Sequence, residues 1–132
     1  MMAMQLSEAA EVLDGRYAPV DTAFRGVSTD SRKLEAGSLF FALQGPNFDG
    51  HEYLAEAQQR GASAAAVSRQ CRTELPLLEV SDTRLALGSL AGYWRSRFSI
   101  PVVAITGSNG KTTVRAMVEA ILARCGQTLS TQ

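Results

Sequence analysis

The stretch VVAITGSNGKTT, Val102–Thr113, constrains the fold most strongly, because a glycine-rich turn here joins an apolar strand to a helix. The strand is predicted over Ile100–Thr106, and the helix is predicted from Lys111 to about Arg124. Apolar residues recur in that helix at three- and four-residue intervals and share one face: Val114, Met117, Val118, Ile121, Leu122 and Cys125. Such a strand–turn–helix unit is typical of α/β folds with a parallel sheet.

The residues before this unit alternate between helical and strand-like segments. Helices are predicted over Leu6–Leu13, His51–Arg60 and Asp82–Phe98. Strands are predicted over Ser38–Leu43, Ser63–Val67 and Leu77–Val80, and Phe24–Arg32 is predicted to be a strand that runs into a polar turn. Gln44–His51 is rich in turn residues and is predicted to be a loop, whereas Gln127–Gln132 resembles the start of another strand. The alternation predicts an α/β fold with a largely parallel sheet and a domain boundary near Ser99.

Local signals refine the predicted helices. Ser7 is a possible N-cap of the first helix, and Asp82 is an acidic cap of the longest one. Gly88 and Gly92 lie four residues apart on one face of that helix, where each costs about 1 kcal/mol relative to alanine. Close packing against a neighbouring element would explain why both are present.

Bulk composition excludes several classes of protein. Lys and Arg number 13 and Asp and Glu number 13, so no basic surface for nucleic acid is expected. No apolar run approaches the ~20 residues of a membrane helix, and the start lacks the basic region of a signal peptide. Cys71 and Cys125 fit no metal-binding spacing and are expected to be small apolar thiols in a reducing cytosol. A cytoplasmic protein without membrane insertion is expected.

The glycine-rich turn has the groups that a phosphate site needs, although it departs from the common P-loop. Only two residues separate Gly107 from Gly110, where the usual pattern has four before its Gly-Lys pair. Backbone N–H groups can still converge on an anion at the start of the helix. Lys111 could reach the terminal phosphates of a nucleotide, and Thr112 or Thr113 could offer a hydroxyl to Mg²⁺. The alternative is a simple β-to-α turn with a solvent-facing lysine.

These residues resemble a known family. TGSNGKTT, Thr106–Thr113, resembles the shortened ATP loop of the Mur ligases, the ATP-dependent amide-forming enzymes of peptidoglycan synthesis. Folylpolyglutamate synthases share the loop, but the residues before it favour the Mur branch, because Ser28–Val67 is similar to the UDP-binding N-terminal domain of these ligases. Phe48–His51 (FDGH) and Val80–Ala91 look most like the branch that adds D-alanyl-D-alanine to UDP-N-acetylmuramoyl-tripeptide.

The resemblance implies an α/β UDP-substrate-binding N-terminal domain over residues 1–98. Over 99–132 it implies the first strand–P-loop–helix unit of a parallel-sheet ATP-binding domain. The residues implied to hold the uridine and its phosphates are Thr29, Ser31, Pro46, Asn47 and Phe48. The residues implied for the ATP loop are Gly107, Ser108, Asn109, Gly110, Lys111, Thr112 and Thr113, with Lys111 as the catalytic phosphate-binding residue and Thr112 as the Mg²⁺ ligand.

The residues themselves leave alternatives open at the uridine site. Hydroxyl groups at strand ends suit the polar edge of uracil, and Phe48 could stack on the ring. Ser31 could equally be a turn-forming hydroxyl. Asp30 and Arg32 could be a local ion pair, and His51 is expected to have a capping or packing role.

The implied reaction has two steps. ATP phosphorylates the terminal carboxylate of UDP-N-acetylmuramoyl-tripeptide, and the amine of D-alanyl-D-alanine then attacks the acyl phosphate. Alternatives are the Mur ligase that adds the third amino acid (meso-diaminopimelate or lysine), a freestanding P-loop phosphotransferase, and a non-catalytic nucleotide-binding module. The family has three domains, and these 132 residues resemble one domain and the start of the second. We therefore expect them to be inactive alone, with the apolar stripe of the last helix uncovered, and we expect a full-length enzyme to be a monomer.

Overall fold

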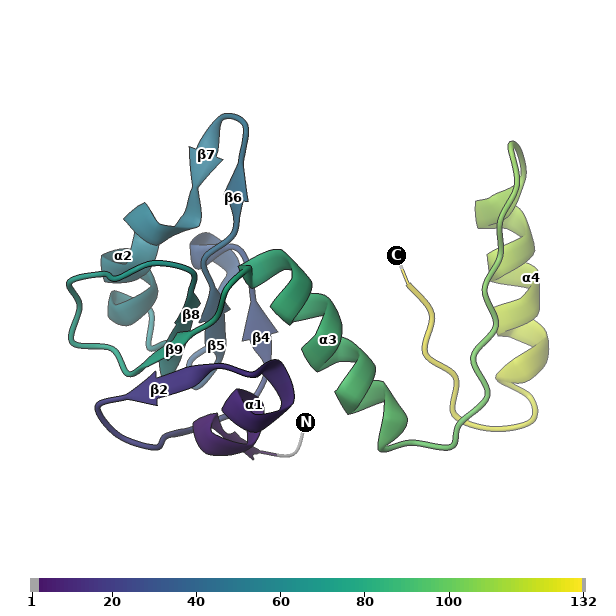
Figure 1. Ribbon diagram of the computed structural model, residues 1–132. Coiled ribbons are helices and arrows are strands. Elements are labelled where there is room, and N and C mark those ends of the chain that lie inside the picture. Colours follow the sequence, from purple (N-terminus) through teal and green to yellow (C-terminus); the bar gives the residue numbers. More distant parts are fainter. Residues whose placement is uncertain (1–2, 132) are drawn as a thin grey trace. The chain divides into compact units, whose positions relative to one another are not determined.

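The computed structural model describes residues 3–131, which form two compact units divided between Phe98 and Ser99 (Figure 1). The strands of the first unit are β1 (Met4–Gln5), β2 (Arg16–Ala18), β3 (Ala23–Phe24), β4 (Val27–Ser28), β5 (Leu39–Phe41), β6 (Gln44–Gly45), β7 (Phe48–Asp49), β8 (Ala64–Val67) and β9 (Leu77–Glu79). Its helices are α1 (Leu6–Leu13), α2 (Leu54–Gln59) and α3 (Thr83–Ser96), with short 3₁₀ helices η1 (Ser31–Lys33) and η2 (Gly50–Tyr53). The second unit contains α4 (Lys111–Leu122).

Among the described residues, a five-stranded sheet in the order β2-β9-β8-β5-β4 forms the centre of the first unit. Strands β4, β5, β8 and β9 are parallel, and β2 pairs antiparallel with β9 at one edge. This arrangement confirms the predicted α/β class with a largely parallel sheet. The carboxyl ends of the four parallel strands lie at the same edge, where α/β proteins commonly bind their ligands.

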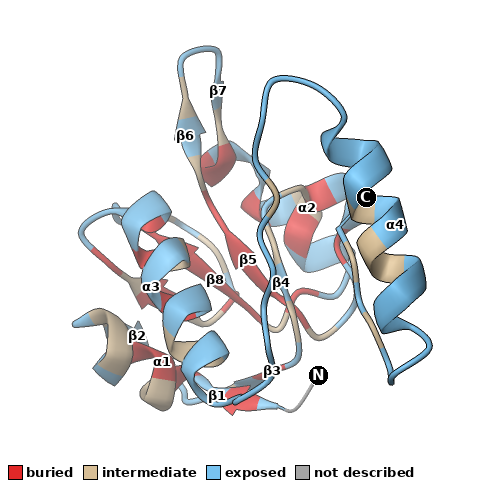
Figure 2. Ribbon diagram, turned by 90° about the vertical axis from the view of Figure 1, so that its right-hand side faces the viewer, coloured by how far each residue is buried: buried red, intermediate tan, exposed pale blue. Residues whose placement is uncertain are grey.

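Alternate side chains of the central strands point into two hydrophobic cores. In β5, Leu39 and Phe41 belong to one core and Phe40 belongs to the other, as the two-residue period of a strand requires. One core packs the sheet against α1 and α3, and the other packs it against α2 and against Leu34, the residue that follows η1. Figure 2 shows β5 and β8 as buried strands between these helices. The first unit is therefore a three-layer α/β/α arrangement.

The segment predicted as a loop over Gln44–His51 is more regular than expected. Strands β6 and β7 pair as an antiparallel hairpin whose two-residue turn is Pro46-Asn47. A Cβ on Gly45 would lie 3.2 Å from the ring of Phe48, which faces it across the hairpin. The turn residues predicted the chain reversal, but two-residue strands are too short to show a period of two.

Two predictions about the helices are wrong. Ser7 does not cap α1 but lies within it, and its amide and hydroxyl donate to the two carboxylate oxygens of Asp21 at 2.9 and 2.7 Å. A Cβ built on Gly88 or Gly92 would meet nothing within 4 Å, so the described structure does not contain the close packing predicted there. Asp82 caps α3 as predicted and accepts two first-turn amides at 2.8 and 2.9 Å.

The second unit confirms its predicted helix but not the strand predicted before it. Helix α4 begins at Lys111, as the sequence predicts, and ends at Leu122. Residues 100–106 belong to no strand ladder within the described chain. A strand needs a partner backbone for its N–H and C=O groups, and the apolar pattern alone does not supply one. Another strand was predicted to start over Gln127–Gln132; its residues 127–131 are likewise unpaired with a strand, and Gln132 lies outside the described residues.

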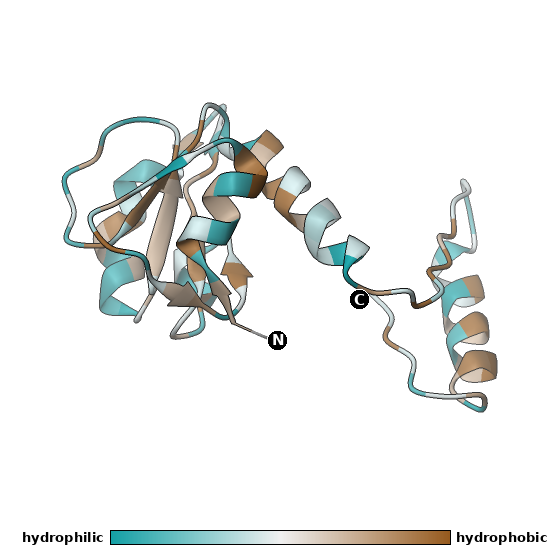
Figure 3. Cartoon of the chain, turned by 60° about the horizontal axis from the view of Figure 1, so that its bottom comes forward, coloured by the Kyte–Doolittle hydropathy of each residue, from teal (hydrophilic) through white to brown (hydrophobic). Residues whose placement is uncertain are grey.

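The apolar stripe of α4 is exposed, as expected from the sequence. Met117 is 62% exposed and Ile121 is 65% exposed. Figure 3 shows hydrophobic residues along α4, and Figure 2 colours most of the helix as exposed. Val102 and Val103 in the preceding segment are exposed as well. The second unit therefore has regular helical structure without a hydrophobic core of its own.

Candidate functional sites

A cavity of about 410 Å³ lies at the carboxyl edge of the sheet, and we call it the strand-end pocket. Its walls come from the turn after β4, from β5, from the β6–β7 hairpin and from η2. The residues that line it are Thr29, Asp30, Ser31, Arg32, Phe40, Phe48, Gly50 and Tyr53. Four segments that are separate in the sequence therefore form one site.

Short polar side chains shape the turn after β4. The hydroxyl of Ser28 donates to the carbonyl of Asp30 at 3.0 Å, and the Asp30 carboxylate accepts the amide of Arg32 at 3.0 Å. Ser31 is buried, and its hydroxyl donates to Oε2 of Glu56 at 3.0 Å. A hydroxyl oxygen has two lone pairs, so Ser31 can still accept a hydrogen bond from a ligand.

Three aromatic side chains also line the pocket. Phe48 in β7 and Tyr53 at the end of η2 are 48% and 43% exposed, whereas Phe40 in β5 is buried. Exposed aromatic faces in a cavity are suited to stacking on a nucleobase. The strand-end pocket thus combines ring faces with hydroxyl groups.

Asp30 and Arg32 form a two-point ion pair at the pocket wall, which confirms the local pair considered from the sequence. Nε and Nη2 of Arg32 donate to the two oxygens of Asp30 at 3.0 and 2.9 Å. The side-chain hydrogen bond from Arg32, followed by the bond from its amide, lowers the pKa of Asp30 from 3.8 to about 2. A guanidinium has five N–H donors, so this pair leaves donors that can bind an anion.

The structure brings together part of the predicted uridine site. Thr29, Ser31 and Phe48 line the strand-end pocket. Pro46 and Asn47 do not, because they form the exposed turn of the hairpin. Uridine binding by all five residues stays a prediction.

Other residues of this site were not predicted from the sequence. Tyr53 lines the pocket, and Glu56 bonds to Ser31 although 25 residues separate the two. Neither residue shows a local signal, since each reaches the site only through the fold of η2 and α2. The sequence does give a reason to expect Asp30 and Arg32 at this site, because they lie within the same TDSR stretch as Thr29 and Ser31.

His51 lies beside the pocket and has a structural role, in agreement with the capping or packing function considered for it. Its side chain is 1% exposed, and its Nδ1 lies 2.6 Å from Oδ1 of Asp49. Asp49 also accepts the amide of His51 at 3.0 Å and so caps η2. These hydrogen bonds, first the one from the His51 amide and then the one from its ring, hold the pKa of Asp49 below its usual value.

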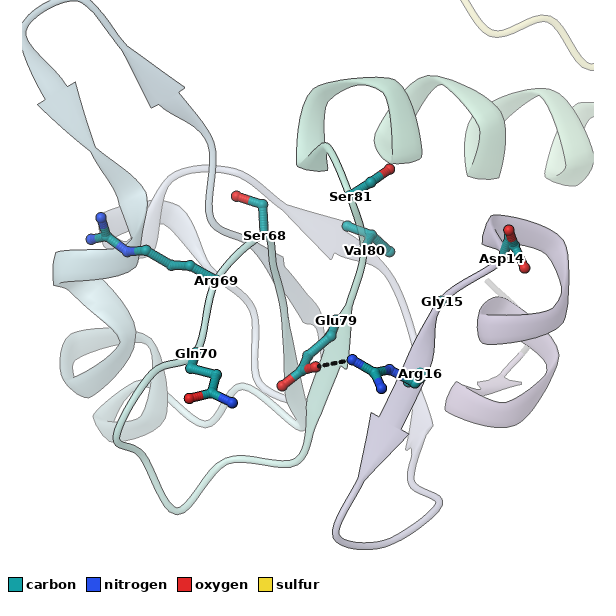
Figure 4. A pocket seen from close by; sticks show the side chains of 9 residues that line it. All are labelled: Asp14, Gly15, Arg16, Ser68, Arg69, Gln70, Glu79, Val80 and Ser81. Carbon is teal, nitrogen blue, oxygen red and sulfur yellow. Dashed lines mark hydrogen bonds and ion pairs between the residues drawn. The ribbon is translucent and has the colours of Figure 1, made fainter.

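A second cavity of about 380 Å³ lies at the ends of β8 and β9 (Figure 4). Arg16 and Glu79 point toward one another at its wall, with Nη2 and Oε2 3.4 Å apart. Arg69, another lining residue, pairs with Asp49 at 2.8 Å. None of the residues predicted from the sequence as site residues lines this cavity. Both of its guanidinium groups, those of Arg16 and Arg69, have carboxylate partners.

In the second unit, the glycine-rich loop leads directly into α4. Gly107 and Gly110 have φ angles of 152° and 74°, and Gly110 precedes the first residue of the helix. The left-handed conformation of Gly110 suits glycine because it has no Cβ. The ammonium of Lys111 donates to the carbonyl of Gly107, so this lysine folds back over the loop. The first amides of a helix lack intrahelical acceptors and lie at the positive end of its dipole.

The loop has a donor set that fits a polyphosphate. Main-chain amides, the Lys111 ammonium and the hydroxyls of Thr112 and Thr113 all lie within the loop and the first turn of α4. For Mg²⁺ the fit is partial, because a threonine hydroxyl is a ligand but Glu119, two turns into α4, is the one carboxylate residue of 99–132. The predicted Gly107–Thr113 site is therefore chemically suited to phosphates, and binding stays a prediction.

Three further properties concern residues 3–131. No helix in this range is long and apolar enough to cross a membrane. No group of three or more His, Cys, Asp or Glu side chains in the same range is placed to hold a metal ion. Cys71 and Cys125 are free thiols.

Comparison with known proteins gives a family match over residues 23–95, to the model described as Mur ligase family, catalytic domain. The chain is similar to the UDP-N-acetylmuramoyl-tripeptide–D-alanyl-D-alanine ligase of Escherichia coli, with 46% identity over 99% of this chain and 29% of that protein. It is also similar to the UDP-N-acetylmuramoyl-L-alanyl-D-glutamate–2,6-diaminopimelate ligase of Aquifex aeolicus, with 41% identity over 78% of this chain and 22% of that protein.

A solved structure is similar over almost the whole chain. A crystal structure of MurF from Acinetobacter baumannii matches with a TM-score of 0.88 and 37% identity, covering 99% of this chain and 30% of that one. The chain thus spans less than a third of the length of each of these three relatives.

Proposed function

Because the chain belongs to the Mur ligase family, we propose that it supplies the UDP-substrate-binding unit, residues 1–98, and the start of the ATP-binding unit, residues 99–132, of a peptidoglycan ligase. The proposed reaction joins D-alanyl-D-alanine to UDP-N-acetylmuramoyl-tripeptide and consumes ATP. The observation that carries this proposal is the 46% identity with the Escherichia coli ligase of that name over 99% of the chain. We place the reaction in the cytoplasm, where ATP is available.

The strand-end pocket is the proposed anchor for the uridine diphosphate. Phe48 and Tyr53 offer ring faces for stacking on uracil, while the hydroxyls of Thr29 and Ser31 offer hydrogen bonds to its polar edge. Arg32 adds a positive charge at the same wall, where it can face a phosphate. Binding the nucleotide end of the substrate in this way restricts the position of the distant carboxylate, which lowers the entropic cost of its reaction.

The loop Gly107–Thr113 is the proposed cradle for the phosphates of ATP. When bound, ATP supplies the phosphoryl group that activates the tripeptide carboxylate for attack by an amine. The loop amides and the Lys111 ammonium would balance negative charge on that phosphoryl group. For this role Lys111 must exchange its bond to the Gly107 carbonyl for a phosphate oxygen. The Thr112 hydroxyl is the proposed Mg²⁺ ligand from this chain.

We expect no ligase activity from these 132 residues alone, since the chain spans 29% of its Escherichia coli relative. Residues 99–132 contain Glu119 as their one carboxylate residue, and the described part of this unit, residues 99–131, has no paired sheet behind the loop. Adding ATP, Mg²⁺ and both substrates to the chain should therefore yield no pentapeptide product. We further propose that the full-length ligase is a monomer.

The second candidate is the branch that adds diaminopimelate. Its support is the 41% identity with the Aquifex aeolicus ligase, although that match covers 78% of the chain rather than 99%. The two candidates share the uridine nucleotide and ATP, so they differ in the amine that is joined and in the peptide that receives it.

A titration of the chain with UDP, followed by ¹⁵N NMR, tests the uridine site. UDP should shift the amides of Ser31, Phe48 and Tyr53, and Phe48→Ala should weaken binding roughly 5- to 150-fold, as expected for one base–aromatic stack of about 1–3 kcal/mol. Lys111→Ala is the matched control and should leave UDP affinity unchanged. If UDP shifted only the amides of residues 107–113, UDP would bind at the loop, and the proposed uridine site in the strand-end pocket would be wrong.

A chimera tests whether the chain can supply these two parts of the D-alanyl-D-alanine-adding ligase. In it, this chain replaces the matching segment of the Escherichia coli ligase, and release of ADP is measured with D-alanyl-D-alanine and UDP-N-acetylmuramoyl-tripeptide. Activity that disappears on Lys111→Ala supports the proposal. A folded chimera that binds UDP and ATP but releases no ADP with these two substrates would contradict it.

A further inference from the structure

Asp49, His51 and Ser68 form a hydrogen-bonded chain, centred on the buried side chain of His51, between the base of the β6–β7 hairpin and the end of β8. Nδ1 of His51 lies 2.6 Å from Oδ1 of Asp49, and the backbone amide of Ser68 lies 3.1 Å from Nε2 of His51. An amide can only donate, so Nε2 is the acceptor and the ring proton lies on Nδ1, where it is donated to Asp49. The contacts thus define the tautomer of the imidazole.

Further contacts hold this chain in place. The side chain of His51 is 1% exposed and that of Asp49 is 16% exposed. Oδ2 of Asp49 accepts from Nη2 of Arg69 at 2.8 Å, so two consecutive residues after β8, Ser68 and Arg69, are bonded to the hairpin side. We call Asp49, His51 and the Ser68 amide the hairpin clamp.

The clamp acts directly behind the strand-end pocket. Phe48 and Gly50, the two neighbours of Asp49 in the sequence, both line that pocket. Gly50 is packed tightly, because its amide donates to the carbonyl of Leu43 at 2.7 Å and a Cβ there would lie 2.8 Å from the Leu43 backbone. A movement of Asp49 would therefore displace a pocket residue on each side.

We propose that His51 is a positioning residue for uridine nucleotides: it ties the hairpin to β8 and so holds Phe48 and Gly50 at the pocket wall. This inference rests on the proposed uridine site. The order Asp–His–Ser resembles a hydrolase triad, but the Ser68 hydroxyl lies 3.4 Å from Nε2 and the Ser68 amide already occupies that nitrogen. The imidazole has no free lone pair for the hydroxyl proton, so its role is structural support of the pocket.

Variants that replace one ring nitrogen at a time test this proposal on the full 132-residue chain. In His51→Asn the amide can stand in for Nδ1 but cannot reach Ser68. In His51→Gln the side-chain carbonyl can take the place of Nε2 and accept from the Ser68 amide. Ser68→Ala is the matched control for the clamp, since it removes the hydroxyl and keeps the amide. Leu90→Ala is the stability control, because Leu90 is buried in the core with α1 and α3.

Two quantities are measured for each variant: the backbone ¹⁵N order parameters of the hairpin without ligand, and the Kd for UDP. In His51→Asn we expect the order parameters of residues 47–50 to fall from about 0.85 to below about 0.6, and the Kd for UDP to rise about tenfold. His51→Gln should fall between this variant and the wild type. Ser68→Ala and Leu90→Ala should keep both values close to those of the wild type.

The outcomes separate this inference from the proposed function. Unchanged order parameters in His51→Asn overturn the clamp, and a loosened hairpin with unchanged UDP affinity overturns its positioning role. If the wild type does not bind UDP, the proposed uridine site fails, and a hairpin that loosens in His51→Asn still supports the clamp. If His51→Asn does not fold, His51→Gln and Asp49→Asn provide the same comparison.

Discussion

The two units of the chain have similar local sequence patterns but differ in what happens to their apolar side chains. In the first unit, Phe41 and Leu78 are fully buried between the sheet and its helices. In the second, Met117 and Ile121 are mostly exposed although α4 is a regular helix of 12 residues. The amphipathic pattern therefore accompanies a helix in both units, whereas a core is present only where strands and helices from elsewhere in the chain cover the apolar face.

Their candidate sites differ in the same way. The strand-end pocket combines four separate segments, including side chains as distant in sequence as Thr29 and Tyr53. The phosphate loop consists of one continuous stretch, Gly107–Thr113, followed by the helix that orients it. A site made of one segment can be recognised from its sequence, but a site made of four becomes complete only when the fold brings them together.

The largest expected effect tests the difference in burial. Phe41→Ala should reduce the free energy of unfolding of the first unit by about 3–5 kcal/mol, because it leaves a cavity in the core. Ile121→Ala, which truncates an exposed side chain of α4, should change stability by no more than about 0.5 kcal/mol. Urea unfolding followed by circular dichroism measures both. A loss above about 2 kcal/mol for Ile121→Ala would show that the stripe of α4 is buried in solution.

A pair of glycine variants tests how tightly each unit packs its backbone. Gly50→Ala should destabilise the first unit by about 1–3 kcal/mol, since the new Cβ would lie 2.8 Å from the Leu43 backbone. Gly126→Ala in the second unit should be nearly neutral, because no atom lies within 4 Å of its Cβ position. The comparison uses the same unfolding measurement. Equal effects for the two variants would contradict the tight approach at the hairpin base.

A smaller effect of opposite sign is expected on the outer face of α3. Gly88→Ala should stabilise the first unit by about 0.5–1 kcal/mol, because alanine favours the helix and its Cβ meets no neighbour there. The thermal unfolding midpoint, compared with that of the wild type, measures this change. Destabilisation instead would mean that Gly88 packs against another surface, as the spacing of Gly88 and Gly92 first suggested.

The smallest expected effect concerns the pH dependence of the first unit. The pKa of Asp30 is about 2 in the folded chain, compared with 3.8 for an unperturbed aspartate. The pair of Asp30 with Arg32 therefore stabilises the fold fully above pH 3.8. That contribution is lost as the pH falls through about 2, because the carboxylate takes up a proton. Asp30→Asn keeps a capping oxygen but lacks the charge. As the pH falls from 3.8 to about 2, the wild type should lose this contribution, so the stability of Asp30→Asn relative to the wild type should rise. The free energies of unfolding of both proteins, measured at several pH values, test this. A difference between them that does not change with pH would show that the pair is not formed.

Much of the fold could be predicted from particular residues. The stripe from Val114 to Leu122 predicted α4, and the Asp82 carboxylate marked the start of α3. The hairpin was missed because its strands have two residues each, too few to show a pattern. Ser7 was misassigned as a cap because Asp21, which bonds to it, comes from 14 residues further along the chain.

The candidate sites follow the same division. Thr29, Ser31 and Phe48 were identified within short motifs and do line one pocket, whereas Tyr53 and Glu56 had no such motif. His51 was a lone histidine in the sequence. Its partners Asp49 and Ser68 became evident only when the hairpin and β8 were placed side by side.

The sequence by itself determined the α/β class, the positions of α1, α3 and α4, and the glycine turn before α4, because helix periodicity, capping and glycine conformation act over a few neighbouring residues. Only the tertiary structure decided which strands pair, which of the predicted residues share a cavity and how the histidine is bonded. Those outcomes depend on contacts between residues far apart in the chain, and local spacing does not encode where such residues meet in space.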